Sequence, residues 1–550
     1  MAQTARIRRE DGKHRSKLIQ HLGIVAGVCN ESRLAELIDQ EVVQKRRKVS
    51  VGQAVQAMIL NALGFSGRAL YLTPRFYKNR PVEVLVGRGL RAEHLHDCSL
   101  GGALDALYEA GITEVFYSVA SKIVHHYGIS TRFAHLDSTT FSLHGQYNSE
   151  EEDIPEGVIH ITKGYSKDNA PELNQVVLQM ICSHRSTLPV WIETLSGNTA
   201  DKKSFGKTVR KFQRQFDGDS MPYMVMDSAF YSKENIAGSE GVRWVTRVPE
   251  TLKEVREHYR RINPGDMGEL APGYRYLPVS SDYGGVQQRW LIVYSEQSYQ
   301  KQIQTFEKRL AKEREENRKA VKHLVNEAFA CEPDAGKAAE KFAAKLRHQR
   351  FSYTIREKRR YGGKGRPSKE AEPVEVEWYI TGELSDDEQA IAASRKRKGM
   401  FVVATNELDT EALSDLQLLE VYKDQGVTVE RGFRFLKDPL FYAESLYLKS
   451  PQRIMALLMV MTLSLLIYSL AEMRIRTSLA QKGKHIWNQK NKPTDRPTIR
   501  WVFMIFEDIL LLYTHTAHGI EKEGMNLQEE HRIVLECLGP VFEKMYFLRK

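Results

Sequence analysis

Two short stretches each place an aspartate at the end of an apolar run and follow it with small residues. They are "FAHLDSTTFSLHG" at 133–145, which contains Asp137, and "MVMDSAF" at 224–230, which contains Asp227. Two carboxylates held close together repel each other unless one is protonated or a cation neutralises them. Oxygen ligands suit Mg²⁺, and two such ions about 3.5–4 Å apart can activate an attacking oxygen and stabilise a leaving oxygen in phosphoryl transfer. The alternative is that each aspartate only caps a helix or a turn.

A third acid stands in "VYKDQGVTVERGFRFLKDP", residues 421–439. Helical spacing turns Val429, Phe433 and Leu436 inward in this segment. It places Glu430, Arg434 and Lys437 together on a neighbouring polar face. One carboxylate followed by cations suits a metal ion bound to a phosphate backbone. The alternative is a solvated Glu–Arg pair on a helix surface.

The elements that position the two aspartates are predicted from five apolar runs between 130 and 249. Their length and β-branched content favour strands, and their near-continuous apolarity indicates burial on both faces. We expect Asp201, which follows the third run, to be the N-cap of a helix. The runs are "RFAHLDSTTFSL", "NQVVLQMICS", "LPVWIETLSG", "PYMVMDSA" and "RWVTRVP".

Composition shifts along the chain predict five regions. Residues 1–129 are amphipathic and helical, and 130–249 carry the strands. Residues 250–399 combine densely charged helices at 300–349 with a hairpin, "FSYTI" and "VEVEWYI", around a basic loop. Residues 400–480 contain the Glu430 helix. We expect residues 481–550 to be helical.

The charge of the chain indicates what kind of partner to expect, and its cysteine content indicates the redox compartment. The 550 residues carry a formal net charge of +10, with a pI near 9.1. This balance favours an anionic partner, nucleic acid first and an acidic membrane surface as the rival. Five scattered cysteines indicate a reducing cytosol and argue against a zinc ribbon. We interpret the neighbouring His94, His96 and Cys98 as ordinary surface residues.

One apolar segment raises the question of a membrane. Residues 454–471, "IMALLMVMTLSLLIYSLA", hold no charge and stand between Arg453 and Arg474. Their length reaches the lower limit for a membrane span. A helix buried on all sides in a large domain has the same pattern, and we favour it because the rest of the chain is highly charged.

The segments around Asp137, Asp227 and Glu430 resemble the DDE triad of bacterial insertion-sequence transposases, in the group with a Tyr–Arg–Glu–Lys (YREK) signature. "GYSKDNAPELNQVVLQMICS", "PVWIETLSGNTADKKSF", "FVVATNE" and "PTIRWVF" extend the resemblance through most of the chain. The resemblance implies an α/β fold whose ribonuclease H-like mixed sheet carries the acids at 130–249 and 400–480. It implies an insertion domain at 250–399 and a helical, DNA-binding N-terminal region at 1–129.

The signature expects Tyr-x2-Arg-x3-Glu-x6-Lys. Glu430 and Lys437 fit its last part, whereas Tyr422 is one residue too far from Glu430 and is followed by Gln425 where the arginine is expected. The resemblance implies DNA contacts from Tyr422 and Lys437. Arg431 or Arg434 could supply the missing charge, and we expect Arg434 to contact DNA.

Together with the cysteine content, the resemblance implies a cytoplasmic bacterial transposase, associated with the nucleoid when bound to DNA. Asp137, Asp227 and Glu430 would hold two Mg²⁺ ions, with Mn²⁺ as a substitute. The partner would be double-stranded DNA, both inverted-repeat ends and target, bound by a homodimer without a membrane. The alternatives are a DNA-binding regulator with a dead site, a membrane-associated protein, and a ribonuclease H-like nuclease without strand transfer.

A second short motif lies in the basic loop of the predicted hairpin. "KGRPSK", residues 364–369, resembles the core of an AT-hook, in which an extended Arg-Pro segment lies in a narrow A·T minor groove. We expect Lys364 and Arg366 to contact DNA. The alternative is a flexible hairpin tip with solvated charges.

Overall fold

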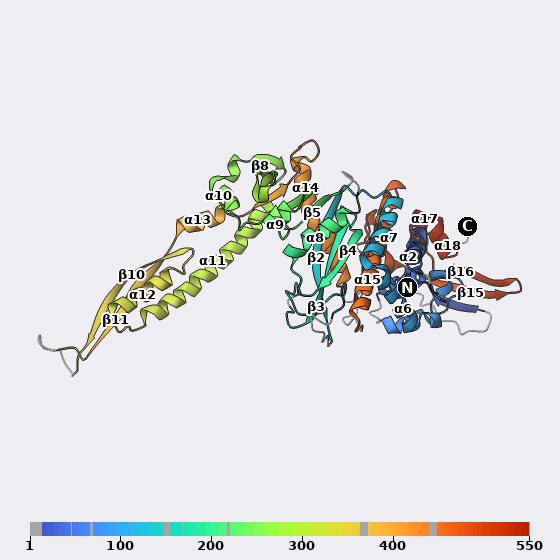
Figure 1. The fold of residues 1–550 in the computed structure, drawn as a ribbon, viewed down its shortest axis with the longest axis horizontal. Coiled ribbons are helices and arrows are strands. Elements are labelled where there is room, and N and C mark those ends of the chain that lie inside the picture. Colours follow the sequence, from blue (N-terminus) through green and yellow to red (C-terminus); the bar gives the residue numbers. More distant parts are fainter. Residues whose placement is uncertain are drawn as a thin grey trace. The chain divides into compact units, whose positions relative to one another are not determined.

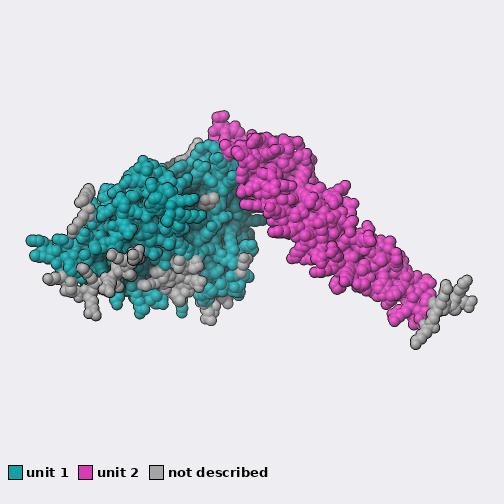
Figure 2. Space-filling view, turned by 180° about the vertical axis from the view of Figure 1, so that it is seen from behind, with its two compact units in different colours: residues 1–246, 283–286, 417–550 teal, residues 247–282, 287–416 magenta. Residues whose placement is uncertain are grey.

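The computed structural model describes residues 14–43, 45, 47–65, 70–145, 147, 154–168, 170–216, 221–362, 372–438 and 448–548. The chain divides into two compact units (Figure 2). Unit 1 comprises residues 1–246, 283–286 and 417–550, and unit 2 comprises 247–282 and 287–416. Unit 2 therefore interrupts unit 1 in the sequence. The five-region division remains a prediction.

A mixed sheet forms the centre of unit 1, with the strand order β4-β3-β2-β5-β6. Strand β3 is antiparallel to both β2 and β4, whereas β5 is parallel to β2 and β6 is parallel to β5. All five predicted strands are confirmed, and with them an α/β fold. Their bounds are β2 Phe133–Leu143, β3 Asn174–Ser183, β4 Pro189–Ser196, β5 Tyr223–Met226 and β6 Trp244–Val248.

Helices on both faces explain why these strands are almost continuously apolar. On one face, the Gln179 side chain of β3 is hydrogen bonded to Ser204 and Thr208 of α8 (Asp201–Gln213). On the other face, α14 (Asp415–Leu436) packs its Gly432 against Met180, where an added Cβ would be 3.1 Å from the Met180 methyl group. Successive residues of a strand point to opposite faces, so both faces of β3 are covered.

Helix α15 (Pro451–Gln481) contains the long apolar segment and is the central helix of unit 1. It contacts β4 on one side and the N-terminal helices α1, α3, α6 and α7 on the other (Figure 1). Of its most apolar 18-residue window, 89% is buried inside the protein, so the predicted buried helix is confirmed. The helix is also long and apolar enough to cross a membrane by length and composition alone.

The remaining helices of unit 1 surround α15 or flank the sheet. They are α1 Leu22–Glu31, α2 Leu34–Glu41, α3 Val51–Leu63, α4 Thr73–Tyr77, α5 Val82–Leu85, α6 Asp97–Ala110, α7 Ile112–His126, α9 Lys233–Ala237, α16 Ile499–Ile505, α17 Glu529–Leu538 and α18 Pro540–Met545. Two short strands, β13 Ile486–Trp487 and β14 Pro493–Thr494, pair with each other.

The two ends of the chain differ from the helical expectation. Residues β15 Leu510–Thr516 and β16 Gly519–Met525 form a hairpin, and β1 His14–Leu18 pairs with β15. Within β15, Leu511 and Tyr513 are buried while their neighbours are not, which is the period-two pattern of a half-buried strand. The expectation of helix throughout 481–550 is wrong here because leucines fill both faces of "LLLYTHT" and hide that alternation. The partner strand, moreover, lies at the far end of the sequence.

Unit 2 contains a four-stranded antiparallel group, a long helix and a hairpin. In the helix α11 (Glu296–Val325), Phe306 and Leu310 are buried with Ile391, and Ile303 packs against them. The predicted hairpin is confirmed and is longer than its two motifs. The elements are α10 Lys253–Arg261, β7 Gly268–Ala271, β8 Tyr274–Ser281, β9 Gln288–Ser295, α11 Glu296–Val325, α12 Glu332–Ala343, β10 Gln349–Arg360, β11 Glu375–Asp386, α13 Glu388–Lys396 and β12 Met400–Thr405.

Candidate active site

Asp137 and Asp227 come together where β2 and β5 meet. The two strands are parallel neighbours, and their register pairs Leu136 with Met226. Asp137 follows Leu136 inside β2, which continues to Leu143, so the expectation that Asp137 ends its strand is wrong; Asp227 follows Met226, the last residue of β5. Because adjacent strands lie about 4.8 Å apart, the backbone delivers both carboxylates to one place. The predicted adjacency is confirmed, whereas the catalytic role of the two acids remains a prediction.

The side chain of Asp137 projects toward the face of the sheet that α14 covers. In the β2–β3 ladder Asp137 is directly opposite Met180, and directly opposite residues share a face. Met180 contacts Gly432 of α14 on that face. The Glu430 helix therefore covers the face on which Asp137 lies.

Burial raises the pKa of both aspartates. The pKa of Asp137 is raised to about 7, and the charges of Asp227 and Asp201 act in the same direction. Burial also raises the pKa of Asp227, with a further contribution from Asp201. Lys167 opposes the rise at both aspartates. The carboxylates are therefore close enough to repel one another, and a cation beside them favours their charged forms.

Two residues that the sequence analysis did not assign to the site complete this group, Asp201 and Lys167. The Lys167 ammonium lies 3.0 Å from Asp201 Oδ2 and 3.9 Å from Asp137 Oδ1. It also donates to the carbonyl and the hydroxyl oxygen of Ser138, both at 2.7 Å. The Ser138 hydroxyl in turn donates to Asp201 Oδ1 at 2.5 Å. Asp201 is thus a third carboxylate of the site.

The expected helix cap at Asp201 is wrong. The N-cap of α8 is Ala200, no side chain caps this helix, and Asp201 is its first residue. The Asp201 carboxylate binds Ser138 and Lys167 in place of the backbone amides. Asp201 follows the end of an apolar strand as Asp227 does, but a run of small residues separates it from that strand. Lys167 lies in a loop and has no such signal.

Glu430 lies on α14 with an exposed side chain. The same helix contacts the backbone at Asp227, because the Gln425 amide, in its favourable orientation, accepts from the Asp227 N–H at 2.9 Å and donates to the Met226 carbonyl at 3.3 Å. The helix is therefore fixed to the end of β5. The structure places Glu430 on the helix that covers the aspartates, and its metal-binding role remains a prediction.

The cations of α14 have different environments. Lys437 contacts both carboxylate oxygens of Asp168, at 2.6 and 2.7 Å, and lies 5.7 Å from the centre of the Phe141 ring. Arg431 instead contacts the buried Glu472 of α15 at 2.6 Å. A pair with a buried acid indicates a structural role for Arg431. Arg434 is exposed, so it is the better of the two arginines for a DNA contact.

The other predicted DNA contacts fall partly outside the described residues. Tyr422 lies on α14 and is half-buried. Lys364 and Arg366 of "KGRPSK" lie outside the described residues, between β10 and β11. Their predicted contacts therefore have no structural test.

The chemistry of the donor groups at this site suits Mg²⁺, although the carboxylate oxygens of the three aspartates do not all lie within 4.8 Å of one another, as the possible ligand atoms at the start of α6 do. Asp137, Asp227 and Asp201 supply carboxylate oxygens, and hard divalent cations prefer oxygen ligands. The site already holds a cation, since the Lys167 ammonium lies beside the carboxylate oxygens of Asp137 and Asp201. The chemistry that such a group of acids supports is metal-assisted displacement at phosphorus.

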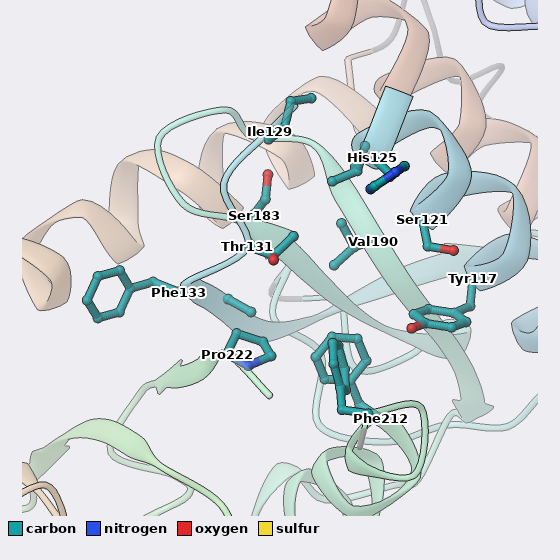
Figure 3. Close-up of a pocket in the computed structure, with 13 residues that line it drawn as sticks. Tyr117, Ser121, His125, Ile129, Thr131, Phe133, Ser183, Val190, Phe212 and Pro222 are labelled. Carbon is teal, nitrogen blue, oxygen red and sulfur yellow. The ribbon is translucent and has the colours of Figure 1, made fainter. Parts of the chain in front are cut away.

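An apolar cavity of about 150 Å³ lies elsewhere in unit 1, beside the start of β2 (Figure 3). Tyr117, Phe133, Val190 and Phe212 are among the side chains that line it. Neither the three aspartates nor Lys167 line this cavity, so it is separate from the candidate active site.

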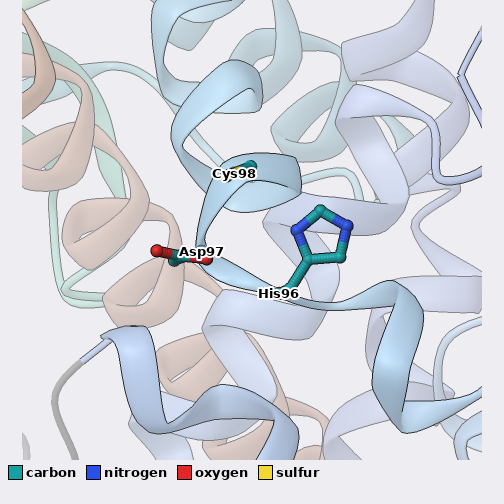
Figure 4. A group of neighbouring side chains, drawn as sticks. All are labelled: His96, Asp97 and Cys98. Carbon is teal, nitrogen blue, oxygen red and sulfur yellow. The ribbon is translucent and has the colours of Figure 1, made fainter.

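His96, Asp97 and Cys98 form an exposed group at the start of α6 (Figure 4). The His96 Nδ1 accepts the Ser99 N–H at 3.3 Å and so caps the helix. His94 is similarly engaged, because its Nδ1 accepts the Arg91 N–H at 3.1 Å. Helix and turn capping account for both imidazoles, which supports their interpretation as surface residues.

Comparison with known proteins identifies the class. Residues 130–467 match the family model described as "Transposase DDE domain", and residues 14–121 match a domain of unknown function, DUF4277. Because the first match covers more than half of the chain, this protein belongs to the DDE transposase domain family. No curated protein matches the chain. A piggyBac transposase, solved by cryo-EM in a synaptic complex with hairpin DNA, is similar over 88% of this chain and 79% of its own, at 10% identity and a TM-score of 0.36.

Proposed function

We propose that this protein is the transposase of a bacterial insertion sequence, and that it cuts the ends of its element and joins them to target DNA. The observation that carries the proposal is the register of β2 and β5, which delivers Asp137 and Asp227 to one place. Membership of the DDE transposase domain family supports phosphoryl transfer on nucleic acid. The spacing of Glu430 and Lys437 supports the group with the YREK signature.

The strand arrangement of unit 1 supports a ribonuclease H-like core. Three antiparallel strands, β4, β3 and β2, continue into the parallel strands β5 and β6. In this arrangement Asp137 of β2 and Asp227, which follows β5, belong to one site. The helix that carries Glu430, α14, covers the same face.

Asp137, Asp227 and Glu430 would hold two Mg²⁺ ions, or Mn²⁺ in their place. When bound, the ions supply Lewis-acid stabilisation of the charge that develops on the attacking and leaving oxygens. The chain's own part is to fix the carboxylates, through the β2–β5 register and the contact of Gln425 with the Asp227 N–H. A site fixed in this way aligns the attacking oxygen with the phosphorus, and alignment itself lowers the barrier.

The substrate would be double-stranded DNA. A net charge of +10 favours a polyanion. Arg434 lies on the Glu430 helix and Lys437 directly follows it, where both can bind the phosphates that flank the scissile bond. Water would first release a 3′-OH at the element end, and that 3′-OH would then attack a target phosphate. We further propose that the protein is cytoplasmic and binds DNA as a homodimer. The five free cysteines support the cytoplasmic compartment.

The test begins with the DNA on either side of the gene. Matching inverted repeats there would identify the ends, and a duplex that carries one repeat would then be incubated with the protein and Mg²⁺. We expect a nick that leaves a 3′-OH, followed by joined products when target DNA is added. Nicking without joining would identify a nuclease instead, and binding without nicking would identify a regulator.

A further inference from the structure

Lys167 and Asp168 are adjacent residues of opposite charge, and each binds a group of the opposite sign in the candidate active site. Lys167 contacts Asp137 of β2 and Asp201 of α8, and Asp168 binds Lys437, which directly follows α14. The Thr140 hydroxyl oxygen of β2 accepts the Lys167 N–H at 3.2 Å, which fixes the dipeptide beside the sheet. The proposed function requires a metal ion and a DNA phosphate as ligands. The Lys167 side chain has the charge sign of the metal ion, and the Asp168 side chain has that of the phosphate.

The Lys167 ammonium occupies the position of a cation. Its Nζ lies within 3.0 Å of three oxygens, the Ser138 carbonyl and hydroxyl and Asp201 Oδ2, and 3.9 Å from Asp137 Oδ1. The Lys167 side chain is only 32% exposed, and those of Asp137 and Asp201 are 20% and 23% exposed. A metal ion that uses these carboxylates must therefore compete with the ammonium.

The Asp168 carboxylate occupies the position of a phosphate. Both of its oxygens contact Lys437 Nζ, at 2.6 and 2.7 Å. Lys437 is the residue to which the proposed function assigns a DNA phosphate, and a lysine binds a phosphate through the same donors. A phosphate can therefore replace the Asp168 carboxylate on this ammonium.

We propose that Lys167 and Asp168 are internal stand-ins for the metal ion and the DNA phosphate, and that they hold the ligand-free site in a charge-balanced state. The inference rests on the proposed function. Metal binding displaces the Lys167 ammonium from Asp137 and Asp201, and DNA binding displaces the Asp168 carboxylate from Lys437. Both residues position the groups that bind ligands, and neither takes part in the chemical step.

The metal half is tested by calorimetric titration of the full chain with Mn²⁺, and with Mg²⁺, in the absence of DNA. Lys167→Gln removes the competing charge and should tighten metal binding about tenfold, whereas Lys167→Arg keeps the charge and should stay near the wild type. Lys203→Gln is the matched control, because Lys203 is exposed on α8 two residues from Asp201. A structural role for Lys167 would predict the opposite sign, since a disordered site binds metal more weakly.

The phosphate half is tested by DNA binding in EDTA, with a duplex taken from the DNA that flanks the gene. Asp168→Asn should tighten binding about two- to fivefold, and by more than the exposed control Glu172→Gln, which removes the same charge nearby. In a Lys437→Ala background, Asp168→Asn should change the DNA affinity no more than Glu172→Gln does. The double-mutant cycle thereby isolates the interaction between Asp168 and Lys437.

Equal or weaker metal binding by Lys167→Gln overturns the metal half, and an effect of Asp168→Asn that persists without Lys437 overturns the phosphate half. A wild-type protein that binds neither metal nor DNA would instead refute the proposed function. The two failures are therefore distinguishable.

Discussion

Asp137 and Asp227 are separated by 90 residues in the sequence (227 − 137 = 90), and they directly follow the two register-paired residues at the end of the β2–β5 ladder. A parallel register brings both acids to the same level of the sheet, and one helix, α14, contacts the Asp227 backbone and covers the Asp137 face.

Metal binding should stabilise the folded protein through these two acids. A ligand that binds only the folded state at a hundred times its dissociation constant adds about 2.7 kcal/mol to the free energy of unfolding. We expect Mg²⁺ or Mn²⁺ to raise the melting temperature of the wild type, and we expect the doubly substituted Asp137→Asn, Asp227→Asn variant to lose this response. The control is Asp97→Asn, an exposed acid in the group with His96 and Cys98. If the control loses the response and the double variant keeps it, the metal binds at α6.

Glu430→Gln should separate chemistry from folding. The side chain is exposed, so the free energy of unfolding should change by less than about 0.5 kcal/mol. Nicking of an element end should fall at least tenfold if the carboxylate is a metal ligand. Glu420→Gln on the same helix is the control, since Glu420 pairs at 3.6 Å with Arg185 and not with the aspartates. Equal nicking by both variants would remove Glu430 from the site.

Arg431 and Arg434 should respond differently to alanine substitution. Arg431→Ala removes one of the cations beside the buried Glu472, leaving Arg476 at 2.9 Å, and should lower the free energy of unfolding by roughly 1–3 kcal/mol. Arg434→Ala should leave stability unchanged and should reduce the salt dependence of DNA binding by about one phosphate contact. Urea unfolding and salt titrations measure the two effects. The reverse pattern would assign the DNA contact to Arg431.

Stability should fall at acidic pH because of His21. Burial lowers the pKa of this imidazole to about 4, its Nε2 is hydrogen bonded to the Leu63 carbonyl at 2.8 Å, and its ring stacks on Phe503. The unfolded chain binds the proton near pH 6.5, so folding stability is complete above that pH and is lost as the pH falls toward 4. Between pH 7.5 and pH 5 the loss should be roughly 2 kcal/mol.

The measurement for His21 is urea unfolding of the wild type and of His21→Gln at both pH values. Glutamine keeps a donor for the Leu63 carbonyl but does not titrate. The difference in stability between the two proteins should shrink at pH 5. Parallel pH profiles would show that His21 does not cause the acid sensitivity.

Much of the unit 1 sheet could be predicted from local sequence. Strands covered on both faces are almost continuously apolar, so runs such as 174–183 could be recognised without knowledge of their neighbours. The prediction that Asp137 ends its strand is wrong, because β2 continues to Leu143. The position of Asp227 directly after β5 and the buried helix at 454–471 are confirmed. In each of these cases the signal lies within one segment.

The rest depends on contacts between distant segments. Asp201 has the sequence of a helix cap, and only the position of Ser138 and Lys167 turns its carboxylate to the active site. Helical spacing places Arg434 on the face of Glu430, but only the structure shows that Arg431 pairs with the buried Glu472 on α15. The terminal hairpin pairs with β1 from the opposite end of the chain, so no local pattern indicates it.

The most direct test of the central claim is Mg²⁺-dependent nicking of an element end by Asp137→Asn and by Asp227→Asn, measured together with their binding to the same DNA. Each substitution keeps the shape of the side chain and removes the charge that a metal ligand needs. We expect nicking to fall at least about a hundredfold in each variant, because several kcal/mol of transition-state stabilisation are lost, while end binding is retained. Near-normal nicking by either variant in Mg²⁺ would contradict the central claim.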